Sequence, residues 1–321
     1  MTEFSTEVEA AEGLATAFQK LKSEISKVVV GQDQVVNLML TSIFCQGHSL
    51  LIGVPGLAKT LLIQTIASAL DLNFSRIQFT PDLMPSDILG AETLDNERNF
   101  KFIKGPIFGN IILADEINRT PPKTQAALLE AMQEKAVTIA GQKYDLPKPF
   151  FVLATQNPIE QEGTYPLPEA QLDRFMFNIL LDYPSYQQEI DIVKNTTSEK
   201  IAVASQVITA DEIAFFQNLV RKVPVADNVV EYAVRLVHNT RPVDGNAPKI
   251  TREYLEWGAG PRASQFLIIA AKCNCILSGK FSPDIEDVKS VAQATLRHRL
   301  VRNFKAEADG VTVDEIIEQL L

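Results

Sequence analysis

The chain has few cysteines, no long apolar run and no excess of positive charge. Its three cysteines, Cys45, Cys273 and Cys275, are an odd number, and no second Cys/His pair lies near the last two in sequence. This pattern argues against a disulfide framework or a zinc site and favours buried structural thiols. No stretch approaches the roughly 18 consecutive apolar residues of a membrane span, so none is expected.

Charge and length narrow the class of protein further. The chain carries 30 basic and 40 acidic side chains, a net charge of −10, which argues against broad, non-specific nucleic-acid binding. Residues 1–13 are acidic and lack the basic-then-apolar pattern of a secretory signal, so we expect a cytoplasmic protein. The 321 residues, of which 46% are hydrophobic, suggest about two domains with a sizeable core.

The most informative segment is a glycine-containing loop between an apolar strand-like run and a helical pattern. It differs only at Ala58 from G-x-x-x-x-G-K-[ST], in which backbone N–H groups and a helix N-terminus cradle phosphates. In that pattern Lys59 reaches the β- and γ-phosphates and Thr60 places a hydroxyl on Mg²⁺. Alanine at position 58 is a mild departure that is tolerable if this residue has already entered the helix, because a methyl group fits a helical backbone. The alternative is a chance glycine turn, which the context disfavours. The predicted phosphate-binding residues are Gly53, Val54, Pro55, Gly56, Leu57, Ala58, Lys59, Thr60 and Leu61.

Polar residues follow two further apolar runs. Asp115 and Glu116 end the run 111–114, where one carboxylate can hold Mg²⁺ and its neighbour can activate a water for attack on the γ-phosphate. The alternative is an acidic pair that begins a helix. Asn157 follows the run 150–154, where its amide can hydrogen-bond the attacking water. An ordinary Asn-Pro turn is an equally good interpretation of Asn157.

Two arginines are candidates for anion contacts. Arg174 is interpreted either as a surface charge paired with Asp173 or as an arginine finger that enters a neighbouring subunit's nucleotide site, and the local sequence leaves both open. Arg262 stands in the first turn of an apolar helical stretch, where the helix dipole opposes a positive charge. This position favours an anion contact over a purely structural role.

Strand-like runs alternate with helical patterns over residues 1–183, which predicts a doubly wound parallel α/β sheet with its chemistry at the carboxyl ends of the strands. Tyr183-Pro184 marks the expected boundary, and residues 184–321 should form a smaller, mostly helical domain. Thr120 is expected to cap a helix that continues to residue 134. The expected helices are 4–29, 34–44 and 61–70, the expected strands 50–52, 73–79, 111–114, 150–154 and 175–181, and the expected hairpins lie around 99–104 and 137–146.

As a set, the motifs resemble the MoxR family of AAA+ ATPases, within the helix-2-insert group, over nearly the whole chain. Residues 53–60 resemble Walker A, and residues 111–116 with the extension to 125 resemble Walker B. The further matches are Asn157 to sensor 1, Arg174 to the arginine finger, Arg262 to sensor 2, and Gly31 and Gln32 to the segment that packs near the adenine.

The resemblance implies a P-loop NTPase fold with a C-terminal helical lid, and ATP and Mg²⁺ as cofactors. It assigns Mg²⁺ to Thr60 and Asp115, and implies a catalytic set of Lys59, Glu116, Asn157 and Arg174. It also makes residues 87–104 a helix-2 insert and 137–146 a pre-sensor-1 hairpin that face the pore or a partner. The alternative for both inserts is a solvated edge hairpin.

The activity that the resemblance implies is ATP hydrolysis by a homo-oligomeric ring, which we expect to be a hexamer. Hydrolysis would drive remodelling, maturation or metal insertion in a partner, often a protein with a von Willebrand factor A domain. One alternative is the ATPase subunit of a magnesium or cobalt chelatase. The other is a scaffold that switches with nucleotide and hardly turns over.

Overall fold

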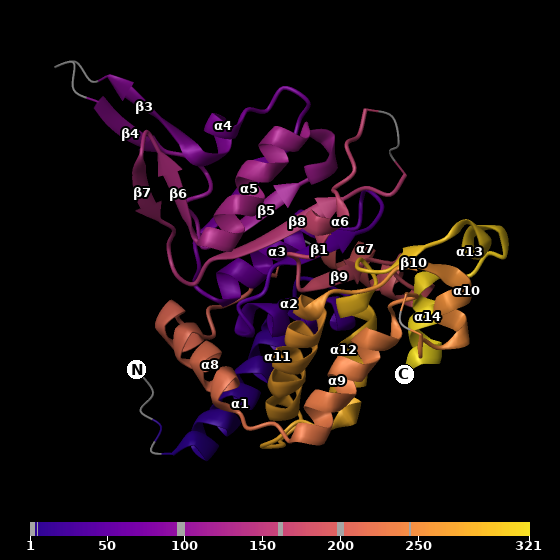
Figure 1. Ribbon diagram of the computed structural model, residues 1–321. Helices are drawn as coiled ribbons and strands as arrows, with labels where there is room; N and C mark the ends of the chain where they lie inside the picture. The colour runs from indigo at the N-terminus through magenta and orange to yellow at the C-terminus, as the bar shows by residue number, and fades with distance from the viewer. Residues whose placement is uncertain (1–3, 5, 95–99, 160–162, 198–201, 244) are drawn as a thin grey trace.

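A parallel sheet forms the centre of the protein (Figure 1). The computed structural model describes residue 4 and residues 6–94, 100–159, 163–197, 202–243 and 245–321. Five strands lie in the order β2-β5-β8-β1-β9, and every neighbouring pair is parallel. The predicted parallel sheet is therefore confirmed. The strands are β1 (Ser49–Ile52), β2 (Phe74–Gln78), β5 (Ile111–Asp115), β8 (Phe151–Gln156) and β9 (Phe177–Leu180).

Helices cover both faces of the sheet because successive strand residues point to opposite sides. Leu51 and Leu113 pack into the core beneath α1 (Glu7–Ser26), α2 (Asp33–Phe44) and α3 (Lys59–Ala69), whereas Leu50 and Ile112 pack with α5 (Pro122–Glu134). The continuous apolar strands are those of a sheet buried on both faces. Figure 1 shows α5 above the sheet and α1 and α2 below it.

The second half of the chain is mostly helical, as predicted. At its centre lies α11, which packs against α8, α9 and α12 and also against α1 and α2. One apolar core therefore runs from the sheet into the helical part. The elements are α7 (Tyr186–Thr196), α8 (Ala210–Lys222), α9 (Asp227–Asn239), α10 (Lys249–Tyr254), β10 (Leu255–Trp257), α11 (Pro261–Leu277), α12 (Ile285–Leu296), β11 (Val301–Arg302), α13 (Phe304–Ala308) and α14 (Val313–Leu320).

Two antiparallel hairpins project from the α5 side of the sheet (Figure 1). The first, β3 (Gly90–Leu94) with β4 (Phe100–Lys104), follows the short helix α4 (Pro85–Leu89), and the second pairs β6 (Ala136–Ile139) with β7 (Gln142–Asp145). They touch through Phe102 and Tyr144, whose rings stack with centroids 4.3 Å apart. Both expected hairpins are present, and residues 95–99 of the first lie outside the described chain.

The predicted capping of α5 by Thr120 is wrong. A short 3₁₀ turn (Ile117–Arg119) follows β5, and Thr120 ends that turn in an extended conformation. The cap position falls one residue later, on Pro121, which has no side-chain oxygen to offer. The Thr120 hydroxyl is buried, with no hydrogen-bond partner among the described residues. None of the helices in the described part of the chain combines the length and apolar character needed to cross a bilayer.

Candidate functional site

The loop between β1 and α3 carries the predicted phosphate-binding residues. Its first residue must be glycine, because a Cβ on Gly53 would lie 2.8 Å from Cβ of Leu181. Gly56 has φ +86, and a Cβ there would meet no atom within 4 Å, so the loop opens onto space at that point. The ε-ammonium of Lys59 donates a hydrogen bond to the carbonyl oxygen of Gly53. This bond places the lysine side chain across the loop.

Ala58 does not meet the condition under which alanine is easily tolerated, because it has not entered the helix. It is the N-cap residue of α3, with φ 53 and ψ 29, in the left-handed region. This region costs an L-residue with a Cβ about 1–2 kcal/mol, and glycine avoids the cost. The loop therefore stores backbone strain at the one position where the chain departs from the phosphate-loop pattern.

Replacing Ala58 by glycine should raise the free energy of unfolding by about 0.5–1 kcal/mol. Relief of the left-handed strain exceeds the extra entropy that glycine gains in the unfolded chain. Urea titration of the two proteins measures the change. The matched control is Ala67→Gly, in the interior of α3, which should destabilise by about 1 kcal/mol. A destabilised Ala58→Gly variant would contradict the strain argument.

Lys59 links the loop to the two carboxylates that end β5. Partial burial lowers the pKa of Lys59, while the nearby negative charges of Asp115 and Glu116 oppose the shift. The three groups are therefore close enough to interact electrostatically. Thr60 follows in the first turn of α3, and a hydroxyl and a carboxylate are hard oxygen ligands of the kind that Mg²⁺ prefers. The residues present fit a nucleotide phosphate with its metal ion.

Asp115 is held by hydrogen bonds on both carboxylate oxygens. The hydroxyl of Thr155, on β8, donates to Oδ1 at 2.7 Å. Arg76, on β2, donates to Oδ2 from Nη2 at 2.6 Å and from Nε at 3.1 Å. The same threonine oxygen accepts from the backbone N–H of Glu116 at 2.8 Å. Strands on both sides of β5 thus fix the Walker-B-like carboxylates.

Glu116 also has a left-handed backbone, with φ 58 and ψ 49. Its Oε2 accepts from Nε2 of Gln78 at 2.9 Å and pairs with Nη1 of Arg119 at 3.0 Å. Strained non-glycine residues of this kind cluster at functional sites. Sequence reasoning missed every partner of the two carboxylates. The partners on β2 could have been found from strand alternation. Arg76 and Gln78 stand two residues apart on one strand, so their side chains lie on the same face of the sheet.

Asn157 follows β8 directly and is 5% exposed. Its Oδ1 accepts from the backbone N–H of Ile159 at 3.2 Å, so the side chain closes a local turn. Its amide –NH₂ is the donor end of the same group. The two interpretations of this residue are therefore compatible, because the oxygen shapes the turn while the nitrogen can donate to a water.

Arg174 lies on the α5 face of the sheet, after the short helix α6 (Glu169–Leu172). Its Nη1 donates to the carbonyl oxygen of Leu129 at 2.9 Å. The alternative of a surface pair between Arg174 and Asp173 is wrong, because Asp173 binds other arginines. One of them is Arg262, whose Nη1 lies 2.9 Å from Oδ2 of Asp173. The anion contact expected of Arg262 is thus made with a carboxylate of its own chain.

The loop between α1 and α2 contains the expected adenine-side segment. Gly31 has φ +79, and a Cβ there would lie 2.5 Å from Cδ of Gln188 in α7. Nε2 of Gln32 donates to the carbonyl oxygen of Asp182 at 3.4 Å. Leu181, the residue before Asp182, contacts the start of the phosphate loop. The segment therefore lies beside that loop, joined to it by the chain that leaves β9.

Comparison with known proteins agrees with this geometry. Residues 48–177 match the family model of the ATPase family associated with various cellular activities (AAA), and residues 247–320 match the AAA lid domain. Chaperone MoxR1 of Mycobacterium tuberculosis is 42% identical over 317 residues, covering 97% of this chain and 83% of that protein. The chain belongs to the MoxR family of AAA+ ATPases.

Other relatives span the same length. The uncharacterized protein YeaC of Bacillus subtilis is 40% identical and covers 97% of this chain and 95% of its own. Protein MoxR of Methylorubrum extorquens is 29% identical over 88% of this chain and 87% of its own. A crystal structure of a proposed ATPase from Cytophaga hutchinsonii superposes with a TM-score of 0.91 at 42% identity, covering 97% and 95% of the two chains. The P-loop fold with a helical lid is thereby confirmed.

Proposed function

We propose that this MoxR-family chain is a Mg²⁺-dependent ATPase that works as a homo-oligomeric ring and uses hydrolysis to remodel a partner protein. One observation carries the proposal. The strands β5, β8 and β1 are neighbours in the sheet, and their carboxyl ends bring Asp115 and Glu116, Asn157 and the phosphate loop to one edge. Such an edge is where parallel α/β sheets bind ligands.

At the phosphate end of the site, different residues bind the phosphate oxygens and the metal ion. The amides of the loop and of the first turn of α3, together with Lys59, bind the phosphate oxygens. Thr60 and Asp115 would hold the metal ion, and Thr155 orients the Asp115 carboxylate. Mg²⁺ held there would offset the negative charge that develops on the phosphate.

Glu116 then serves as the base for the attacking water. Gln78 and Arg119 hold its Oε2, which leaves Oε1 as the oxygen to accept the water's proton. The amide nitrogen of Asn157, on the neighbouring strand, donates to the same water and orients it. A fixed base and a fixed water supply the alignment that in-line attack on the γ-phosphate needs.

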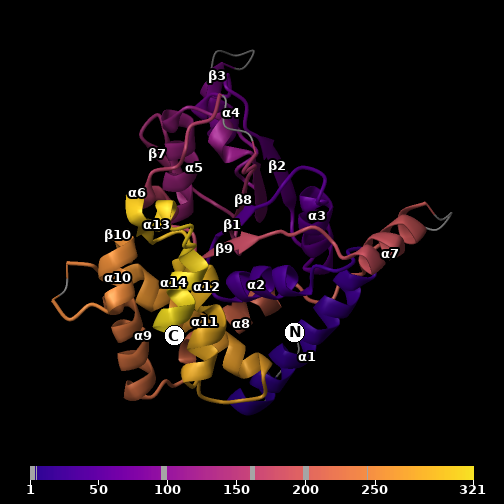
Figure 2. The same cartoon turned by 90° about the vertical axis from the view of Figure 1, so that its right-hand side faces the viewer.

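We assign Arg174 to the nucleotide site of the next subunit. Within its own chain it is bonded to α5, on the sheet face opposite α3. Figure 2 shows α3 and α6, the helix just before Arg174, on different sides of the molecule. An arginine placed there completes a site only if a second copy docks against it. We infer a closed ring, with six subunits as the expected number for this family.

The partner surface is assigned to the hairpins on the α5 side. On the β3–β4 hairpin three large apolar side chains are exposed, Leu94 at 60%, Phe100 at 75% and Ile103 at 54%. The name of the relative Chaperone MoxR1 supports remodelling or maturation of a client, and we propose a partner with a von Willebrand factor A domain or a metal-dependent enzyme. The relatives named as MoxR favour this role over a chelatase subunit.

The test is ATP hydrolysis with Mg²⁺ over a wide range of protein concentration, with the oligomer size followed in parallel. Specific activity should rise as rings form, because each site gains its neighbour's arginine. Lys59→Ala is the control and should lose nucleotide binding at every concentration. Tight nucleotide binding without turnover at any oligomer size would instead support the nucleotide-switched scaffold.

A further inference from the structure

Arg299, just after α12, is the most deeply buried arginine beside the arginine-finger segment. Its side chain is 2% exposed, and its Nε lies 2.8 Å from Oδ1 of Asp173. Its Nη2 donates to the carbonyl oxygens of Asp173 at 2.8 Å and of Phe175 at 2.6 Å. These two carbonyls belong to the residues on either side of Arg174. One guanidinium therefore fixes the main chain on both flanks of the proposed finger.

The guanidinium is charged and anchored to the helical part. Burial lowers the pKa of Arg299 to about 10, and Asp173 opposes the shift, so the group stays cationic at neutral pH. Its Nη1 donates to the carbonyl oxygen of Thr295 in α12, and the Phe266 ring lies 5.2 Å from its central carbon. Burial and the neighbouring Arg299 hold the pKa of His298 well below its usual range, so the ring beside it is neutral.

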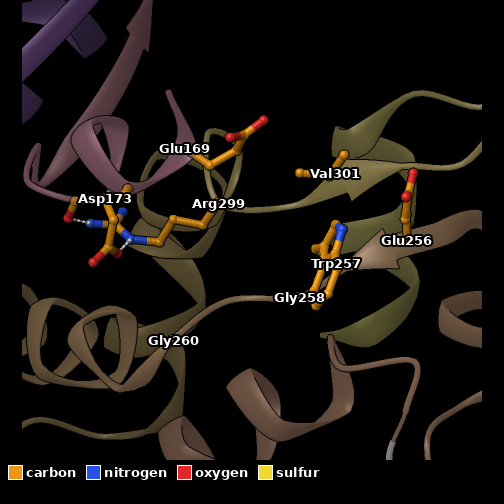
Figure 3. Close-up of a pocket in the computed structure, with 9 residues that line it drawn as sticks. Glu169, Asp173, Glu256, Trp257, Gly258, Gly260, Arg299 and Val301 are labelled. Carbon is orange, nitrogen blue, oxygen red and sulfur yellow. Dashed lines mark hydrogen bonds and ion pairs between the residues drawn. The ribbon is translucent and has the colours of Figure 1, made fainter. Parts of the chain in front are cut away.

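Asp173 connects this anchor to a second arginine. While Oδ1 faces Arg299, Oδ2 binds Arg262 at the start of α11. Figure 3 shows Asp173 and Arg299 joined on one side of a surface cleft, with Trp257 across from them. The cleft has a volume of about 520 Å³ and opens beside α6 rather than at the phosphate loop. Asp173 and its two arginine partners thus lie at the surface that would contact a neighbouring subunit.

We propose that Arg299 is a positioning residue for the arginine finger, and that Asp173 joins Arg174 and Arg262 into one unit that is presented to the neighbouring subunit. The inference rests on the proposed function, in which Arg174 acts across the subunit boundary. Since α12 packs on β9 and one core spans the sheet and the helical part, Arg299 ties the segment around Arg174 to the helical part.

The decisive variant is Arg299→Lys. A single ammonium on a flexible stem cannot bind the carboxylate and both flanking carbonyls in the fixed geometry of a guanidinium. Misplacement of a catalytic group by about 1 Å can cost on the order of 10²-fold in rate. We expect kcat of the assembled protein to fall by about 10²-fold, while KM and the affinity of isolated subunits for ATP stay unchanged, because the subunit's own phosphate loop is intact.

Mixing experiments separate positioning from general damage. Glu116→Gln subunits should turn over slowly but carry an intact Arg174 face, so adding them to Arg299→Lys subunits should restore hydrolysis at the Arg299→Lys sites. Arg297→Lys is the matched control. Arg297 also binds a carboxylate, that of Asp314, and a β9 carbonyl, that of Asn178, but it does not touch the flanks of Arg174. Its substitution should leave kcat unchanged despite a comparable loss of stability.

The outcomes distinguish failure of the positioning role of Arg299 from failure of the proposed role of Arg174. A wild-type rate for Arg299→Lys beside a slow Arg174→Ala overturns the positioning role and leaves the proposed function standing. Failure of the Glu116→Gln subunits to rescue Arg299→Lys, when they do rescue Arg174→Ala, overturns it as well. A wild-type rate for Arg174→Ala overturns both inferences. If Arg299→Lys does not fold, Asp173→Asn is tested in the same way, with a slow but rescuable rate as the supporting result.

Discussion

Replacing Arg174 by alanine is expected to slow ATP hydrolysis by the assembled protein by about 10³–10⁵-fold, the usual value of an arginine finger. The guanidinium stabilises negative charge that is larger in the transition state than in bound ATP, so the loss should appear in kcat. Binding of ATP by isolated subunits should not change, since Arg174 is bonded to α5 rather than to its own phosphate loop. Steady-state hydrolysis above the assembly concentration measures the first effect and nucleotide titration of dilute protein the second.

The control for Arg174→Ala is Arg235→Ala, which removes an exposed arginine on α9 and should be silent. Oligomer size must be measured for both variants, because an arginine at a subunit boundary also contributes to assembly. An Arg174→Ala ring that hydrolyses ATP at the wild-type rate would mean that another residue stabilises the transition state.

Sequence patterns predicted the elements of the fold well and their exact backbone poorly. Apolar runs located the central strands β1, β5 and β8 because these strands are buried on both faces. The backbone conformation of Ala58 is a feature that such patterns do not predict. The loop from β1 must turn into α3 within a few residues, and the turn imposes a left-handed conformation on whichever residue stands there. Periodicity and composition carry no information about that constraint.

Within the candidate site, the proposed catalytic and metal-binding residues could be predicted from the sequence. The residues that hold them in position could not. Asp115, Glu116 and Asn157 each follow an apolar run, a signal that is local in sequence. Their supports come from elsewhere: Arg76 reaches Asp115 across 39 residues, and Arg299 reaches Asp173 across 126. Such contacts depend on strand order and on helix packing, which one sequence without pairing information does not determine. The roles of the site residues and the domain boundary at Tyr183-Pro184 stay predictions.

Glu116→Gln is expected to retain ATP binding and to lower turnover by about 10²–10⁴-fold, the usual contribution of a general base. The amide has nearly the shape of the carboxylate and its oxygen can still accept from Gln78, so the local structure should persist. It cannot take a proton from water. Single-turnover hydrolysis with excess protein isolates the chemical step, and equilibrium binding of ATP tests the ground state. Glu130→Gln, an exposed site on α5, controls for the change in net charge. Normal single-turnover hydrolysis by Glu116→Gln would transfer the role of base to another group and leave the left-handed backbone of Glu116 without a catalytic explanation.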